Sequence, residues 1–321
     1  MANKTKKRLI ISFSLVLFLS ILVFSFYILA PGQFLELRAG YYKYKADVEE
    51  DFIDVDNYKW SYFKNKNKKD KETIVFVHGF TGSKMFWLEF LAFFKDYNVI
   101  VPDLPGHGNN SYFQEDNYSI RENTKRLNSF VDKLGLKNFY LVGISLGGAI
   151  SGYYASLYPD KVKKLVLIDA AGAKADRMSP YFQFILTTGE NLLIFKDRSG
   201  FNKMMSFLFV KPPKTPSHII DYYLKQKDKM NPRYERIFND LINEINTEGN
   251  PLKEDNLKNI VCPTLIIWGK EDKIIDISAG YNLNKSIKNS KLIIVENVGH
   301  VPPIEAKEFT SSKIREFFAE L

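Results

Sequence analysis

Two kinds of hydrophobic pattern follow one another along the chain, and each predicts a different part of a sheet. Residues 52–55 and 59–63 alternate apolar and polar positions, which is typical of an antiparallel hairpin at a sheet edge. After them come short continuous apolar runs, separated by segments of helix length. These runs are residues 73–77, 99–101, 139–142, 165–168, 265–268 and 292–295. Such runs are typical of a parallel sheet covered on both faces, so we expect an α/β doubly wound sheet with an antiparallel edge hairpin.

One of the intervening helices can be predicted in detail. Ser119 stands at its start, and Glu122 follows at the spacing of a capping box. Ile120, Leu127, Val131 and Leu134 recur on one face, and Gly135 ends the pattern. We therefore expect a helix that packs this face on the sheet.

The segment between the sixth and seventh strands, residues 173–260, is a long insertion without strand-like runs. Its apolar residues gather in helix-length clusters at 181–186, 192–195 and 204–210. This pattern predicts a helical cap over the sheet edge. The Phe, Leu and Met side chains of these clusters have three possible uses: they line an apolar pocket, rest on a bilayer, or pack the cap onto the core.

The N-terminus carries an uncharged apolar stretch, residues 9–30, directly after Lys4, Lys6, Lys7 and Arg8. As a helix, its 22 residues span about 33 Å, which matches a hydrocarbon core of about 30 Å. A cleaved signal peptide is the alternative, but its apolar region is shorter and ends in small residues. We expect an uncleaved anchor. The basic residues before the span favour an inside N-terminus, with the remaining chain on the outer, periplasmic or extracytoplasmic side.

These patterns divide the chain into five parts. We expect a membrane anchor at 1–30, a linker at 31–50, the first part of the core at 51–172, the helical cap at 173–260 and the second part of the core at 261–321.

Composition narrows the chemistry that the chain can carry. A single cysteine, Cys262, allows no intrachain disulfide and no cysteine-based metal or redox site, so we expect it to be a buried spacer. None of the four histidines, at positions 78, 107, 218 and 300, pairs with another at metal-ligand spacing. We therefore expect no metal and no other cofactor. The net charge of +8 fits a surface near anionic lipid or a solvated lysine-rich exterior, and the basic run 64–71 lacks the interleaved aromatic residues of a nucleic-acid site.

The fifth predicted strand ends in Gly143-Ile144-Ser145-Leu146-Gly147, and a small-residue helix follows at once. In this Gly-x-Ser-x-Gly pattern, the turn holds the serine in a strained conformation that projects its hydroxyl clear of the sheet. The two glycines remove side chains that would collide there. The short motif also arises by chance, but its position between strand and helix favours a nucleophile at Ser145.

Further motifs follow the ends of the other strands, where ligands bind in such sheets. They are His-Gly-Phe-Thr at 78–81, Pro-Asp-Leu-Pro-Gly-His-Gly at 102–108, Gly-Lys-Glu-Asp at 269–272 and Gly-His at 299–300. With Ser145, this set resembles the α/β-hydrolase superfamily of serine esterase or lipase type, over residues 51–321. The anchor and the Ile-Asp-Ala-Ala-Gly segment at 168–172 are most similar to the membrane-anchored monoacylglycerol lipase branch and related bacterial lipases.

The chain order Ser145, Asp272, His300 is the one that this fold uses for nucleophile, acid and base. Asp272 is expected to orient one imidazole nitrogen of His300, and the spacing that the resemblance implies favours it over Glu271. Asp169, at the end of the preceding strand, is a second alternative acid that we expect to be structural.

The resemblance also assigns the oxyanion hole to the backbone N–H groups of Phe80 and Leu146. His78 is expected to brace this loop or to contact substrate, and Asp103 and His107 to fix the shape of the neighbouring loop. His218 matches no motif and is expected at the surface. The further candidates for substrate contact are apolar: Phe86, Trp87, Phe184 and Met205.

By this resemblance, the chain is expected to be a membrane-anchored serine hydrolase that cleaves lipid-like, monoacylglycerol-type esters through an acyl-serine intermediate. Its partners would be the ester substrate and the bilayer, without nucleic acid. Two alternatives remain: a hydrolase of non-ester bonds, such as carbon–carbon cleavage, on the same triad, and a non-catalytic binding protein that keeps the fold.

Overall fold

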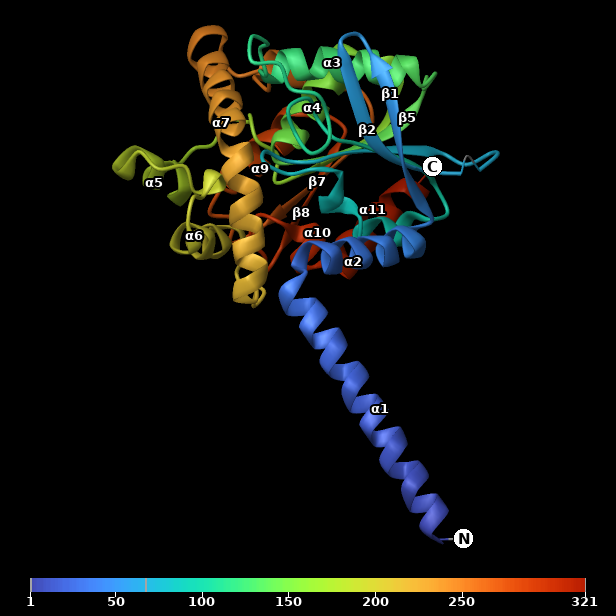
Figure 1. Ribbon diagram of the computed structural model, residues 1–321. Coiled ribbons are helices and arrows are strands. Elements are labelled where there is room, and N and C mark those ends of the chain that lie inside the picture. The colour runs from blue at the N-terminus through green and yellow to red at the C-terminus, as the bar shows by residue number, and fades with distance from the viewer. Residues whose placement is uncertain (1, 67, 321) are drawn as a thin grey trace.

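A computed structural model describes residues 2–66 and 68–320, which form an eight-stranded sheet with helices on both faces (Figure 1). The strand order is β1-β2-β4-β3-β5-β6-β7-β8. The strands span Val48–Val55 (β1), Tyr58–Asn65 (β2), Thr73–Val77 (β3), Asn98–Pro102 (β4), Phe139–Ile144 (β5), Val162–Ile168 (β6), Thr264–Gly269 (β7) and Ser290–Val295 (β8). β2 pairs antiparallel with β1 and β4, and the other pairs are parallel. The expected edge hairpin and parallel strands are confirmed.

The core lies in two layers, one on each face of the sheet. On one face, apolar residues of α3 (Ile120–Lys133), α4 (Leu146–Leu157) and α9 (Ser278–Ser286) pack against the strands. The other face is covered by the 3-10 helices Lys84–Trp87 and Phe90–Phe94 and by α11 (Lys307–Ala319), which follows the short α10 (Pro302–Glu305). Every residue of β5 and β7 is buried, because both faces of these strands are covered.

The insertion between β6 and β7 is helical, as expected. It contains α5 (Pro180–Thr188), the 3-10 helix Leu192–Ile194, α6 (Arg198–Leu208), α7 (Ser217–Glu248) and α8 (Glu254–Leu257). A parallel bridge between Ala173 and Leu252 holds the beginning of the insertion beside its end. Six buried apolar side chains of the cap form a small core together with Ile274 from the loop after β7, so many Phe, Leu and Met residues of the cap serve packing. The six are Tyr181, Leu192, Phe195, Phe201, Met204 and Ile220.

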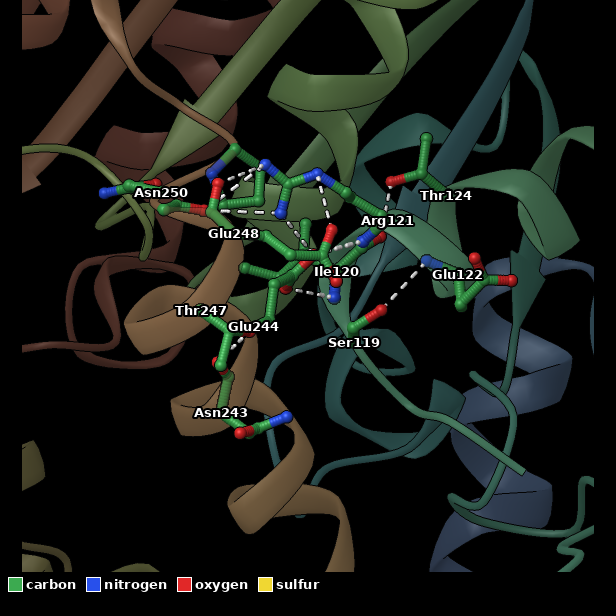
Figure 2. A network of polar contacts seen from close by, with 12 residues as sticks. Ser119, Ile120, Arg121, Glu122, Thr124, Asn243, Glu244, Thr247, Glu248 and Asn250 are labelled. Atoms are coloured by element: carbon green, nitrogen blue, oxygen red, sulfur yellow. Dashed lines mark hydrogen bonds and ion pairs between the residues drawn. The ribbon is translucent and has the colours of Figure 1, made fainter. Parts of the chain in front are cut away.

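A polar network fastens the cap helix α7 to the start of α3 (Figure 2). Glu244 of α7 is buried, and its carboxylate accepts hydrogen bonds from the N–H groups of Ile120 (2.7 Å) and Arg121 (3.0 Å) and from the Arg121 guanidinium (2.9 Å). Ser119 caps the same helix by accepting from the N–H of Glu122 (3.2 Å). The reciprocal half of the capping box is missing, because the Ser119 N–H donates to Asn117 Oδ1. Part of the capping of α3 is therefore supplied by the Glu244 carboxylate of the distant helix α7 and not by neighbouring residues.

The stretch expected as a linker, residues 31–50, forms a helix and the first part of β1. Helix α2 (Pro31–Ala46) begins with proline at its first position and ends at Asp47, whose left-handed backbone (φ 57°) closes the last turn. Ala39, Tyr42 and Ala46 pack against the second core layer. This tertiary packing, which the local sequence does not reveal, makes the segment part of the folded domain.

Helix α1 (Ala2–Leu29) projects away from the sheet domain, whereas α2 lies along it (Figure 1). The segment Ile11–Leu29 of α1 has 19 residues of mean hydropathy 2.4, and none of its side chains is buried in the protein. It is a candidate membrane anchor. The end of α1 meets the start of α7, where the rings of Tyr27 and His218 lie edge to face, 4.5 Å apart. His218, expected at the surface, therefore lies at the contact between α1 and the cap.

Candidate active site

Ser145 occupies the sharp turn between β5 and α4. Its backbone angles, φ 53° and ψ −120°, are rare for a residue with a side chain. Its N–H donates to the carbonyl of Ile168, and its own carbonyl accepts from the N–H groups of Ala149 and Ala171, each at 3.0 Å. These bonds tie the turn to α4 and to the end of β6, and they hold the strained conformation that the sequence motif predicts.

The glycines on either side of Ser145 are required by close backbone contacts. A Cβ at Gly143 would overlap the carbonyl of Gly147 and the hydroxyl of Ser151. A Cβ at Gly147 would overlap the carbonyls of Val77 and His78. The motif is therefore explained by space around the turn as well as by backbone freedom.

Asp272 and His300 lie together at the carboxyl edge of the sheet, in the loops that follow β7 and β8. His300 Nδ1–H donates to Asp272 Oδ2 over 2.8 Å, and both side chains are buried. The other oxygen, Oδ1, accepts from the N–H groups of Ile274 (2.7 Å) and Ile275 (3.1 Å), which fix the carboxylate. Glu271, the competing carboxylate, instead accepts from a backbone N–H of the loop before His300.

Ser145 and His300 do not share a hydrogen bond between their Oγ and Nε2 atoms in the part of the chain that the structure describes. Such bonds often tighten only when substrate is bound. Both residues nevertheless follow strands of one parallel sheet, β5 and β8, at its carboxyl edge.

Asp169 follows β6 and lies between these two sides of the site. It is fully buried, and its Oδ1 accepts from the N–H of Gly269 (2.9 Å), whereas Oδ2 has no hydrogen-bond partner among the described residues. Burial, followed by the nearby charge of Asp272, raises the pKa of Asp169 well above its ordinary value. The hydrogen bond to His300 belongs to Asp272, so Asp169 does not take that role.

The loop after β3 lies directly against Ser145. A methyl group added to Gly79 would stand 3.1 Å from the Ser145 Cβ and 3.6 Å from its Oγ. The N–H groups of Phe80, in this loop, and Leu146, at the start of α4, have no protein acceptor among residues 2–66 and 68–320. Both remain free to donate to a substrate oxygen beside Ser145.

His78 is fully buried and braces this loop through both of its ring nitrogens. Its Nε2 accepts from the N–H of Leu104 (2.9 Å), so Nδ1 carries the proton and donates to the carbonyl of Gly79 (2.8 Å). Burial lowers the pKa of His78 and keeps the ring neutral. Its two nitrogens are thus used by the backbone, which overturns the expected substrate contact.

Lys84 is a buried structural residue of the site that the sequence did not indicate. Its ammonium lies 2.7 Å from Asp103 Oδ2, and its N–H donates to Asp103 Oδ1 over 2.7 Å. The same aspartate accepts from the N–H of Asn109 (2.8 Å), while the buried ring of His107 packs beside His78. This ion pair fixes the loops after β3 and β4, as expected of Asp103. A lone lysine in a polar loop carries no sign of burial, because lysines are almost always exposed.

The four apolar residues that were expected to contact substrate lie in different parts of the fold. Trp87 is fully buried against Phe76 on the far face of the sheet, so it is a core residue and not a substrate contact. Phe86 packs edge-on against Trp87, and Phe184 belongs to the cap core. Met205 contacts both the cap core and the sheet core, so of the four it alone bridges cap and sheet.

Helix α7 covers the loop after β3, which carries Phe80, from the cap side. The rings of Tyr234 and Phe238 lie 6.0 and 5.8 Å from the ring of Phe80. The Lys227 ammonium lies 3.4 Å from the carbonyl of Thr81 and 4.7 Å from the Tyr234 ring centre. A cavity of about 680 Å³ opens beside Phe238 between the elements of the cap. Helix α7 of the cap therefore packs on the loop that carries Phe80, beside Ser145.

Comparisons with known proteins agree with this geometry. The monoacylglycerol lipase ABHD6 of Mus musculus is 29% identical over 304 residues, which cover 92% of this chain and 90% of the relative. Lipase 1 of Psychrobacter immobilis is 30% identical over 247 residues, or 77% of this chain and 76% of that protein. The crystal structure of a membrane phospholipase A, a bacterial virulence factor, superposes with a TM-score of 0.84 at 30% identity and covers 97% of this chain and 98% of that one. A family model for the alpha/beta hydrolase fold matches residues 72–307, and the chain belongs to this family.

Proposed function

We propose that this protein is a serine hydrolase that cleaves carboxylic esters of lipid type through an acyl-serine intermediate on Ser145. One observation carries the proposal: the Asp272–His300 hydrogen bond of 2.8 Å lies at the sheet edge that holds the strained Ser145. The relatives that match most of the chain bear the names of lipases and a phospholipase. No specific observation favours carbon–carbon cleavage or a non-catalytic role.

In the first step, Ser145 Oγ attacks the ester carbonyl while His300 Nε2 takes the hydroxyl proton. Asp272 holds the Nδ1–H of His300 and stabilises the imidazolium that forms. His300 then gives the proton to the departing alcohol, which leaves the acyl group on Ser145. Water repeats the sequence, with His300 as base, and releases the carboxylic acid.

The negative charge on the carbonyl oxygen is stabilised by the N–H groups of Phe80 and Leu146. Loss of one such donor costs about 3–4 kcal/mol of transition-state stabilisation. The donors are backbone groups, so their position depends on the loop that His78 braces from behind and on the first turn of α4.

Lipid substrates are supported by the anchor and the cap. An esterase held by α1 meets its substrates at a bilayer, where acylglycerols and phospholipids are concentrated. We propose monoacylglycerol-type esters as substrates, with the acyl chain against the cap near Met205, where cap and sheet cores meet.

The test is a hydrolysis assay on glycerol monoesters of graded acyl length, with the full-length protein in detergent micelles. Wild type, Ser145→Ala and the exposed control Ser312→Ala are compared. We expect the control to match wild type and Ser145→Ala to lose at least about 10³-fold in kcat. A maximum at medium or long chains supports a lipid esterase. A short-chain maximum would remove the lipid assignment, and equal activity in Ser145→Ala would exclude the mechanism.

We further propose that α1 anchors the protein with the catalytic domain on the outer side of the membrane. The basic residues before the span support this orientation. A phosphatase reporter that folds only outside the cytoplasm, fused after residue 321, tests it. We expect the phosphatase fusion to be active. An inactive phosphatase fusion, together with fluorescence from a second fusion whose reporter fluoresces only in the cytoplasm, would show the opposite orientation.

A further inference from the structure

Three carboxyl groups lie around the loop that carries His300, but they accept different numbers of hydrogen bonds. Asp272 accepts three hydrogen bonds, from His300, Ile274 and Ile275. Glu305, in α10, also accepts three, from the N–H groups at positions 210, 211 and 299. Asp169 accepts only one, from Gly269, and its Oδ2 is buried without a partner among the described residues.

Asp169 and Asp272 are too close for both carboxyl groups to be ionised at low cost. A carboxyl oxygen of Asp169, a carboxyl oxygen of Asp272 and a ring nitrogen of His300 all lie within 4.8 Å of one another. No lysine or arginine forms an ion pair with Asp169 in residues 2–66 and 68–320. Two neighbouring carboxylates in a buried site share a proton, because like charges oppose each other in a low dielectric. The proton belongs on the carboxyl group with the fewest donors.

We propose that Asp169 is a neutral carboxylic acid that donates its Oδ2–H to Asp272, and that it thereby acts as a positioning residue for the acid of the triad. This inference rests on the proposed function of Ser145, Asp272 and His300. The groups that face Asp169 agree with it: the Asp272 and Glu305 charges both raise its pKa, in addition to burial.

A neutral Asp169 solves two problems at once. Protonation gives the otherwise partnerless Oδ2 of Asp169 a hydrogen to donate, and it gives Asp272 a further hydrogen-bond donor. The triad then keeps one negative charge, which stabilises the imidazolium formed when Ser145 is deprotonated. An ionised Asp169 would repel Asp272 and displace the oxygen that holds His300 Nδ1.

The experiment compares Asp169→Asn and Asp169→Ala with the exposed control Asp160→Asn. Asparagine is neutral, has the same shape and keeps an N–H donor toward Asp272, whereas alanine removes the donor. We expect Asp169→Asn to keep roughly tenfold more kcat than Asp169→Ala, with the acid limb of the kcat/KM profile at the wild-type pH. If Asp169 is ionised, Asp169→Asn removes a negative charge near His300 and moves that limb to lower pH, which overturns the proposal.

A second measurement does not depend on activity. The infrared spectrum of the wild-type protein at pH 7 is expected to contain the C=O band of a protonated carboxyl group, which is absent in Asp169→Asn and present in Asp160→Asn. A wild-type spectrum without this band would also overturn the proposal. Failure of the proposed function would be seen in a different experiment, because Ser145→Ala would then keep ester hydrolysis. The infrared result does not depend on that activity and tests the protonation of Asp169 alone.

Discussion

At the scale of single residues, the turn around Ser145 combines strain with close backbone contacts. Substituting Gly147 by alanine brings a methyl group onto the carbonyls of Val77 and His78, so the Ser145 turn and the loop after β3 must move apart. Because displacement by about 1 Å can cost about 10²-fold in rate, we expect Gly147→Ala to lose at least this much kcat, measured by ester hydrolysis.

The control for this substitution is another glycine, Gly40, in the exposed part of α2. Nothing lies within 4 Å of a Cβ added there. Gly40→Ala is expected to stabilise the protein by about 0.5–1 kcal/mol, because alanine is the better helix former. Normal activity in Gly147→Ala would show that steric contact does not position the nucleophile.

Much of the site could be predicted from single residues, but only where a motif marks them. Ser145 with its glycines, and the loops that carry Asp272 and His300, follow strand-like runs and so could be located. Lys84 and the partnerless oxygen of Asp169 could not, because burial and unmet hydrogen bonds arise only when distant loops meet. Trp87 was misassigned for the same reason, since its neighbours do not tell which face of the sheet it enters.

At the scale of elements, the cap is attached to the core through Glu244 (Figure 2). Glu244→Ala leaves the N–H groups of Ile120 and Arg121 and the Arg121 side chain without their buried acceptor. Breaking such a buried pair costs about 3–5 kcal/mol. We expect the Tm in thermal unfolding to fall by roughly 6–20 °C, at about 2–4 °C for each kcal/mol of lost stability. The exposed pair Lys125–Glu122 is the control, and Lys125→Ala should change stability by less than about 1 kcal/mol.

Lys227, also in α7, makes the stability of the fold depend on pH. Desolvation, with a smaller effect of Arg233, lowers the pKa of Lys227 to about 8. The folded protein therefore binds fewer protons than the unfolded chain between about pH 8 and 10.4, and stability rises over this window. We expect Lys227→Met to raise Tm at pH 7 and the gain to shrink toward pH 10. The exposed neighbour Lys225→Met should show no such trend; a constant gain for Lys227→Met would contradict the desolvation.

The elements themselves were largely predictable where periodicity is strong. Strands β3 to β8 are short apolar runs, and α3 has an apolar stripe with a serine cap. Helix α2 escaped prediction because its aromatic and basic residues show no clear apolar face, and its packing on the Phe90–Phe94 side of the core decides its structure. The capping of α3 by Glu244 was also out of reach, since 124 residues separate Glu244 from Ile120.

At the scale of the whole molecule, α1 and α2 follow one another in sequence but make different contributions. The apolar part of α1 has no buried side chain, whereas α2 buries Ala46 and forms ion pairs from Arg38 to Glu89 and from Lys43 to Glu50. The folded domain therefore begins near Ala30, with α2, and the candidate anchor lies before it.

Two truncations separate these contributions. Removal of residues 1–30 takes away the apolar surface and leaves the core contacts, so we expect the protein to leave the membrane fraction without detergent and to keep its Tm within a few degrees. Removal of residues 1–47 also uncovers the core beneath Ala39, Tyr42 and Ala46, and burial of about 25 cal/mol per Å² is lost there. This second variant should unfold at a clearly lower temperature. Equal Tm values for the two truncations would mean that α2 is only a linker, and a full-length chain that stays soluble without detergent would remove the anchor.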